Sequence, residues 1–203
     1  MVVIVSIIFS LSLHEAMHGF TAHWLGDSTA AEHGRLTLNP LRHIDMMTTV
    51  ILPVILILTT GVPFFAAKPV PFNPLRVKYE EFGAALIGIA GPLTNLVLAA
   101  LGGLSIRLWG PQFSGSVLKD VALFILVNLA FLVFNMIPLQ PLDGSRLLYA
   151  FAPEPLQNFM RAIENMGFMI ILVFVLVGFQ FISPVIINIE SALFHILTGV
   201  QLL

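Results

Sequence analysis

Long apolar runs constrain this chain more than any other feature of its sequence. Of its 203 residues, 58% are hydrophobic and 10% are charged, whereas a soluble domain usually has about 25% charged residues. Several runs approach the roughly 20 residues that cross the hydrocarbon core of a bilayer. We therefore predict an all-α polytopic membrane protein with five to six membrane helices. The supporting runs are residues 2–25, 46–67, 83–108, 117–137 and 163–182, followed by a last helix at 184–203.

The rest of the composition excludes several other classes of protein. The net charge is −2 and no basic tract is present, so nothing favours nucleic acid as a partner. The absence of cysteine excludes disulfides, thiolate metal ligands and cysteine nucleophiles. The first run has no small-residue cleavage site and contains polar residues, so we expect a membrane helix rather than a signal peptide. The sequence predicts a single domain, 1–203, and favours no particular oligomeric state.

The chain after the first run does not have the pattern of a simple helix connection. The alternating "RLTLN" at 35–39 predicts a short β-like segment. The apolar run at 46–67 is interrupted by Pro53 and Gly61, and the "KPVPFNP" that follows at 68–74 is predicted to be extended. We therefore expect a short β-like or re-entrant segment after the first helix.

A cluster of ionisable residues, "HEAMH", lies inside the first apolar run. His14 and His18 are four positions apart, which places both rings on nearly the same side of a helix, about 40° apart. Glu15 lies about 100° from His14 on that helix, so it can reach a water molecule near a shared metal ion but is poorly placed to be a ligand. The pattern is typical of zinc sites in which the glutamate is the general base. Ionisable groups at membrane depth cost several kcal/mol, so they indicate a functional site.

Catalytic zinc requires a third protein ligand, and the other histidines are weak candidates. His23 lies on the opposite side of the first helix from His14. His33 and His43 lie in the polar segment and are expected to be solvated. His195 belongs to a polar stripe on the last helix, which predicts a position at the membrane interface or on an inward face.

Two carboxylates remain as possible third ligands. Asp143 lies at the end of an apolar run, beside Gly144, in "NMIPLQPLDGSR". Its position before "GSRLL" is equally suited to a helix N-cap. Asp45, close to the first polar segment, is the rival ligand. Spacing alone leaves these alternatives open.

Three motifs together resemble the site-2 proteases, a family of intramembrane zinc metalloproteases. They are "HEAMHG" in the first run, "GPLTN" in the third and "FNMIPLQPLDGSR" at the end of the fourth, the last matching the family pattern N-x-x-P-x-x-x-x-D-G. The string "GRLTLNPLRHID" is similar to the compact bacterial and archaeal branch, without PDZ or CBS domains. The resemblance extends over residues 12–180 and implies that His14, His18 and Asp143 bind one zinc ion, with Glu15 as the catalytic base.

The resemblance also implies roles for two asparagines. Asn135 matches the motif asparagine, which implies that it orients the scissile peptide or stabilises the oxyanion. Its alternative role is a hydrogen bond between helices. Asn95, in "GPLTN", matches a second family asparagine and is expected either to bind substrate or to be structural.

A shared metal site constrains how the helices cross the membrane. His14, His18 and Asp143 all lie toward the C-terminal ends of their runs, so these two runs must be parallel if the three residues meet there. One crossing between them, 83–108, satisfies this condition, which favours a re-entrant 46–67. Such a loop, with the extended "KPVPFNP", could bind a substrate strand by edge pairing. Alternatively, the ligands meet near the midplane, or Asp143 is not a ligand.

The sequence thus predicts a zinc metalloendopeptidase that cleaves single-span membrane proteins or peptides within the bilayer. The expected location is the cytoplasmic membrane of a prokaryotic cell, where the chain would be a multi-pass protein. A divalent-metal transporter and a non-catalytic metal-binding scaffold are the alternatives. A transporter would require more polar residues along the helices, and the intact His-Glu-His set argues against a scaffold.

Overall fold

The computed structural model describes residues 2–60 and 70–201, and the described residues form helices and connecting segments without strands. Four helices in this part of the chain are long and apolar enough to span a membrane. They correspond to α1 (Val2–Trp24), α4 (Glu80–Trp109), α5 (Gly115–Asn135) and α9 (Phe179–Thr198). The sequence predicted five to six membrane helices, so the observed number is smaller within the described residues.

Shorter helices connect these four. They are α2 (Thr29–Glu32), η1 (Pro40–Arg42), η2 (Met46–Ile51), α3 (Leu52–Thr60), η3 (Pro74–Arg76), η4 (Gly110–Gln112), α6 (Asp143–Phe151), α7 (Glu154–Glu164), α8 (Phe168–Val173) and η5 (Phe174–Gly178).

The predicted β-like segment is not observed. Residues 35–39 form bends and irregular chain, and Asn39 accepts a hydrogen bond from the Leu41 amide at the start of η1. A strand needs a partner for its backbone groups, and the described residues offer none here. Alternation of polar and apolar residues at 35–39 was therefore not sufficient to predict a strand.

The second apolar run forms two short helices in its described part. η2 has 6 residues and α3 has 9, which at 1.5 Å per residue gives about 22 Å of helix, short of a bilayer core of about 30 Å. The run continues into 61–69, outside the described residues. The predicted re-entrant loop and the edge pairing of "KPVPFNP" both fall partly on that segment.

The last membrane helix differs from the two that were predicted at 163–182 and 184–203. An apolar helical stretch runs continuously over Phe174–Thr198, with Pro184 inside it. Proline removes a single backbone donor, and membrane helices tolerate it because neighbouring groups satisfy the freed carbonyl. On α9, His195 is exposed and Thr198 is buried. The residues of the predicted polar stripe therefore differ in their exposure.

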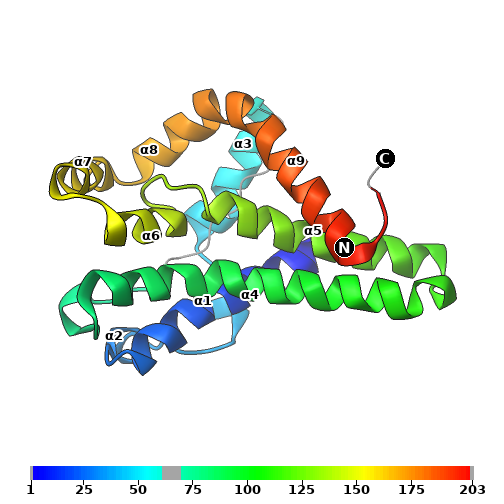
Figure 1. Cartoon of the computed structure of the whole chain (residues 1–203), viewed down its shortest axis with the longest axis horizontal. Coiled ribbons are helices and arrows are strands. Elements are labelled where there is room, and N and C mark those ends of the chain that lie inside the picture. Colours follow the sequence, from blue (N-terminus) through cyan, green and yellow to red (C-terminus); the bar gives the residue numbers. More distant parts are fainter. Residues whose placement is uncertain (1, 61–69, 202–203) are drawn as a thin grey trace.

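α4 is the central helix and contacts α1, α5, α6 and α9. Figure 1 shows α4 and α5 lying side by side and antiparallel, with α9 descending across them. Glycines on α4 permit this close packing: Gly88 faces α6, Gly102 faces α5 and Gly103 faces α9. A Cβ atom at these positions would lie 3.0, 2.7 and 2.8 Å from side-chain atoms of the facing helix. Small residues have this role in membrane helices because backbone proximity increases van der Waals contact.

Candidate metal centre

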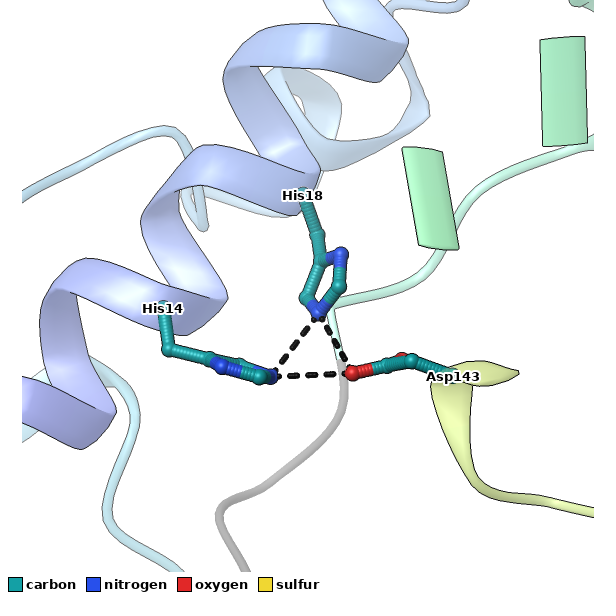
Figure 2. A group of neighbouring side chains, drawn as sticks. All are labelled: His14, His18 and Asp143. Carbon is teal, nitrogen blue, oxygen red and sulfur yellow. Dashed lines mark hydrogen bonds and ion pairs between the residues drawn. The ribbon is translucent and has the colours of Figure 1, made fainter. Parts of the chain in front are cut away.

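Three side chains converge where α1, α4 and α6 meet. His14 and His18 come from α1, and Asp143 is the first residue of α6. The His14 Nε2 atom lies 3.1 Å from His18 Nε2 and 3.0 Å from Asp143 Oδ2. The His18 Nε2 atom lies 3.3 Å from the same Asp143 oxygen. Figure 2 shows all three side chains pointing toward one another.

These separations suit a single tetrahedral zinc ion. Ligand atoms bound at about 2.0–2.1 Å in tetrahedral geometry are about 3.3 Å apart, close to the observed 3.0–3.3 Å. Among the residues that the structure describes, these three form the group of histidines and carboxylates able to hold one metal ion. Both histidines are buried, whereas the Asp143 side chain is 17% exposed. The cluster can therefore be reached from outside the protein past Asp143.

The histidines are oriented from the side opposite the cluster. His18 Nδ1 lies 2.6 Å from the backbone carbonyl oxygen of Ile87, and His14 Nδ1 lies 2.6 Å from Asn95 Oδ1. Both partners are on α4. A carbonyl oxygen only accepts, so His18 carries its proton on Nδ1 and presents the Nε2 lone pair to the cluster. A second hydrogen bond of this kind is usual for metal-binding histidine because it fixes ring orientation and tautomer.

Two glycines leave space for the cluster. A Cβ atom on Gly91 would lie 2.5 Å from the Nε2 atoms of both His14 and His18, so a side chain there would fill the site. A Cβ atom on Gly144 would lie 2.4 Å from the carbonyl oxygen of Met136. Glycine beside Asp143 therefore allows the start of α6 to lie against the end of α5.

The carboxylate of Asp143 is directed to the histidines and not to the helix end. Leu142 is the N-cap of α6, without a side-chain cap. A carboxylate binds a metal ion in its ionised form, and the Asp143 Oδ2 atom faces the Nε2 atoms of both histidines. The alternative prediction, that Asp143 is the N-cap of this helix, is therefore wrong.

Glu15 lies on α1 between the two histidines and is partly buried. Its Oε2 atom accepts a hydrogen bond from the backbone N–H of Val70, at 3.1 Å. The same Val70 side chain lies against Gly19 of α1. The irregular segment 70–73 therefore runs along α1 and contacts the carboxylate directly.

The other candidate ligands lie elsewhere. His23, His33 and His195 are exposed. The prediction that His43 is solvated is wrong: it is 1% exposed, and its Nε2 atom bonds to the carbonyl oxygen of Thr37 because the polar segment folds back over the ring. Asp45, the rival carboxylate, does not belong to the three-residue group.

The two predicted asparagines are both bonded within the protein. Asn135 ends α5, and its Nδ2 atom donates to the carbonyl oxygen of Phe131 on the same helix, at 3.0 Å. Asn95 contacts His14 through Oδ1 and donates from Nδ2 to Asn128 Oδ1. Substrate contacts of Asn135 and Asn95 stay predictions.

Asn128, which is fully buried on α5, was not among the residues predicted from the sequence. Its position could have indicated a hydrogen-bonded or functional residue, because Asn128 is a polar amide in the middle of the apolar run 117–137. Polar side chains at membrane depth are costly unless they are hydrogen-bonded.

Sequence comparisons find relatives that are named as zinc metalloproteases. The chain is 36% identical over 177 residues to "Putative zinc metalloprotease YwhC" of Bacillus subtilis, covering 84% of this chain and 78% of the relative. It is 32% identical over 175 residues to "Putative zinc metalloprotease Rip2" of Mycolicibacterium smegmatis (84% and 65%). It is also 32% identical over 144 residues to "Putative zinc metalloprotease MJ0611" of Methanocaldococcus jannaschii (70% and 71%). No family model and no solved structure matches the sequence. The chain belongs to the site-2 protease-like family of zinc metalloproteases that includes YwhC and Rip2.

Proposed function

We propose that this protein is an intramembrane zinc metalloendopeptidase that hydrolyses peptide bonds in or near the membrane-spanning segments of its substrates. One observation carries the proposal. Two imidazoles and a carboxylate converge to 3.0–3.3 Å on helices of a membrane-spanning bundle, directly beside the glutamate of the same motif.

His14, His18 and Asp143 would hold one zinc ion, and their donor set is that of catalytic zinc sites with an open fourth position. A bound zinc ion supplies Lewis-acid chemistry there, polarising a carbonyl oxygen and making a water molecule more acidic. Glu15 takes the proton from the attacking water and delivers it to the leaving amine nitrogen. The Val70 N–H on Oε2 holds the carboxylate in place for this transfer.

The substrates proposed are single-span membrane proteins or peptides. A helical substrate must unwind locally, because its carbonyl groups are otherwise occupied by backbone hydrogen bonds. Asn135 is proposed to contact the exposed peptide, exchanging its bond to the Phe131 carbonyl for one to the substrate. Asn95 is hydrogen-bonded through both its amide oxygen and its amide nitrogen, so a substrate contact of Asn95 would require it to give up its bond to His14 or to Asn128.

The proposed location is the cytoplasmic membrane of a prokaryotic cell, with the lipid bilayer around a single multi-pass domain. Four helices of membrane-spanning length support this. The three relatives described above come from two bacteria and one archaeon.

The test is zinc content and cleavage measured on the same purified samples in detergent. Wild type, Glu15→Gln and the control Glu81→Gln would be incubated with a panel of single-span substrates. Glu81 is exposed in the first turn of α4, so its replacement changes charge without touching the cluster. All three proteins should bind about one zinc ion per chain. Glu15→Gln should cleave at least about 100-fold more slowly because it has lost the general base.

Two results would contradict the proposal. Equal cleavage by wild type and Glu15→Gln would show that Glu15 is not the base. Zinc binding without cleavage of any substrate, combined with zinc flux in proteoliposomes, would indicate a transporter.

A further inference from the structure

A chain of buried amide groups leads from the backbone of α5 to His14. Asn128 Nδ2 donates to the carbonyl oxygen of Phe124, at 2.9 Å, and Asn95 Nδ2 donates to Asn128 Oδ1, also at 2.9 Å. Asn95 Oδ1 then lies 2.6 Å from His14 Nδ1. Both asparagines are 0% exposed, so water does not compete for these bonds.

The direction of every hydrogen bond in this chain follows from its first member. The Phe124 carbonyl oxygen has no proton to give, so Asn128 must turn its NH₂ group toward it. The Asn128 oxygen then faces Asn95, which must turn its own NH₂ group toward Asn128. The Asn95 oxygen is left facing His14, so His14 must carry its proton on Nδ1. Reversing any amide would bring two oxygens or two donors together in a buried site.

We propose that Asn95 and Asn128 are positioning residues that hold His14 as the Nδ1–H tautomer, with the Nε2 lone pair aimed at the metal. This inference rests on the proposed function, since it assigns these residues to the zinc site. It goes further by extending the metal site to Asn128 in the middle of α5, a helix that supplies no metal ligand.

The two histidines are held in different ways. His18 is oriented by a backbone carbonyl, Ile87, on the neighbouring helix, which no substitution of a side chain removes. His14 depends on two side chains in series. The zinc site is therefore sensitive to substitution at Asn128, a residue that touches neither metal ligand nor substrate.

The test is a double-mutant cycle on zinc affinity. Asn95→Leu, Asn128→Leu and the double variant would be purified in detergent, with Asn188→Leu as control. Leucine suits a buried membrane position, and Asn188 is exposed on α9. The dissociation constant for zinc would be measured by competition with a chelating dye. Helicity and elution volume would show that each variant is folded, and the alanine variant at the same position would replace any leucine variant that is not.

We expect Asn95→Leu to weaken zinc binding about 10- to 100-fold, the usual effect of losing such a hydrogen bond to a metal-binding histidine. Asn128→Leu should weaken it about threefold to tenfold, because Asn95 then loses the partner that fixes its orientation. In the Asn95→Leu background, Asn128→Leu should change affinity by less than about twofold, since the effect passes through Asn95. Asn188→Leu should bind zinc as wild type does.

Four results would overturn the inference. Wild-type affinity in folded Asn128→Leu would show that Asn95 holds His14 without Asn128. Equal losses for Asn128→Leu in both backgrounds would indicate a packing effect independent of Asn95. A wild-type protein that cleaves substrate and binds zinc while Asn95→Leu retains full affinity would reject the inference and leave the proposed function standing. A wild type without zinc affinity would reject both.

Discussion

Gly91 brings the backbone of α4 against the two histidine rings, closer than any side chain would permit. A Cβ atom at this position would be 2.5 Å from both Nε2 atoms, where carbon and nitrogen normally approach no closer than about 3.4 Å. The glycine of "AGPLTN" is therefore explained by space and not by helix flexibility: it leaves room for the two histidine rings, which are the proposed zinc ligands.

At this residue scale we predict that Gly91→Ala impairs zinc binding. Overpacking costs about 1–3 kcal/mol, so zinc affinity, measured by chelator competition, should fall by about 5- to 150-fold at 1.4 kcal/mol per tenfold. Gly115→Ala is the matched control, because a Cβ atom there has nothing within 4 Å. If both alanine variants bind zinc equally well, α4 can move away from the rings and Gly91 is not required for space.

Asp27 connects three elements just beyond the end of α1. Its Oδ1 atom accepts from the backbone N–H of Thr29, at 3.0 Å, and from the Thr29 hydroxyl, at 2.5 Å. Its Oδ2 atom accepts from the backbone N–H of Asn73, at 2.6 Å. Lys78 N–H donates to the carbonyl oxygen of Leu25 nearby. These bonds hold α2 and the segment after residue 70 against α1, and the same segment supplies the Val70 contact to Glu15.

The charge on Asp27 has a predictable dependence on pH. Burial alone would raise the pKa of Asp27, but the hydrogen bonds from Thr29 and Asn73, with the charge of Arg76, lower it below the ordinary 3.8. Because the pKa in the folded state is below that in the unfolded state, the carboxylate stabilises the fold above the unfolded pKa. That contribution is lost as the pH falls through the folded pKa.

At the element scale we therefore predict that Asp27→Asn lowers the unfolding temperature in detergent at pH 7. The free energy of unfolding should fall by about 1–3 kcal/mol, the usual cost when a buried acceptor no longer satisfies its donors. The difference from wild type should shrink as the pH falls below about 4. Asp120→Asn, at a partly exposed position on α5, is the control for the change of charge. A difference that stays constant down to pH 3 would mean that the ionised form is not what stabilises the fold.

The path of the chain across the membrane is a property of the whole molecule. If α1, α4, α5 and α9 all cross, α1 and α5 are parallel, which brings the end of α1 and the start of α6 to the same side, as the cluster requires. The end of α9 then returns to the side of the α4–α5 turn. The structure agrees, since Thr198, Gly199 and Val200 line a surface hollow together with Gly110 and Pro111.

At this scale we predict which positions share a membrane face. The chain has no cysteine, so a single introduced cysteine would be the only thiol in the protein that can be labelled. Ala31→Cys and Glu154→Cys should react with a membrane-impermeant thiol reagent from one side, and Gln112→Cys from the other; all three positions are exposed. Labelling of intact cells against inverted vesicles would show this. Labelling of all three from the same side would mean that α4 does not cross.

The sequence by itself determined the features that local chemistry dictates. Apolar runs of bilayer length predicted the membrane helices, and α1, α4 and α5 begin and end within three residues of the predicted 2–25, 83–108 and 117–137. The spacing of His14 and His18 placed both rings on one helix face, since that depends only on helix geometry.

Only the tertiary structure decided between Asp143 and its alternatives. Asp143 meets His14 across 129 positions of sequence, and the same pattern of residues would serve equally well as a helix cap. Tertiary structure also decided three other features: the burial of His43, the absence of a strand at 35–39 in the described chain, and the pairing of Asn95 with Asn128. Each feature depends on which backbone or side-chain group from another part of the chain lies beside it, and the residues nearby in sequence do not determine that group.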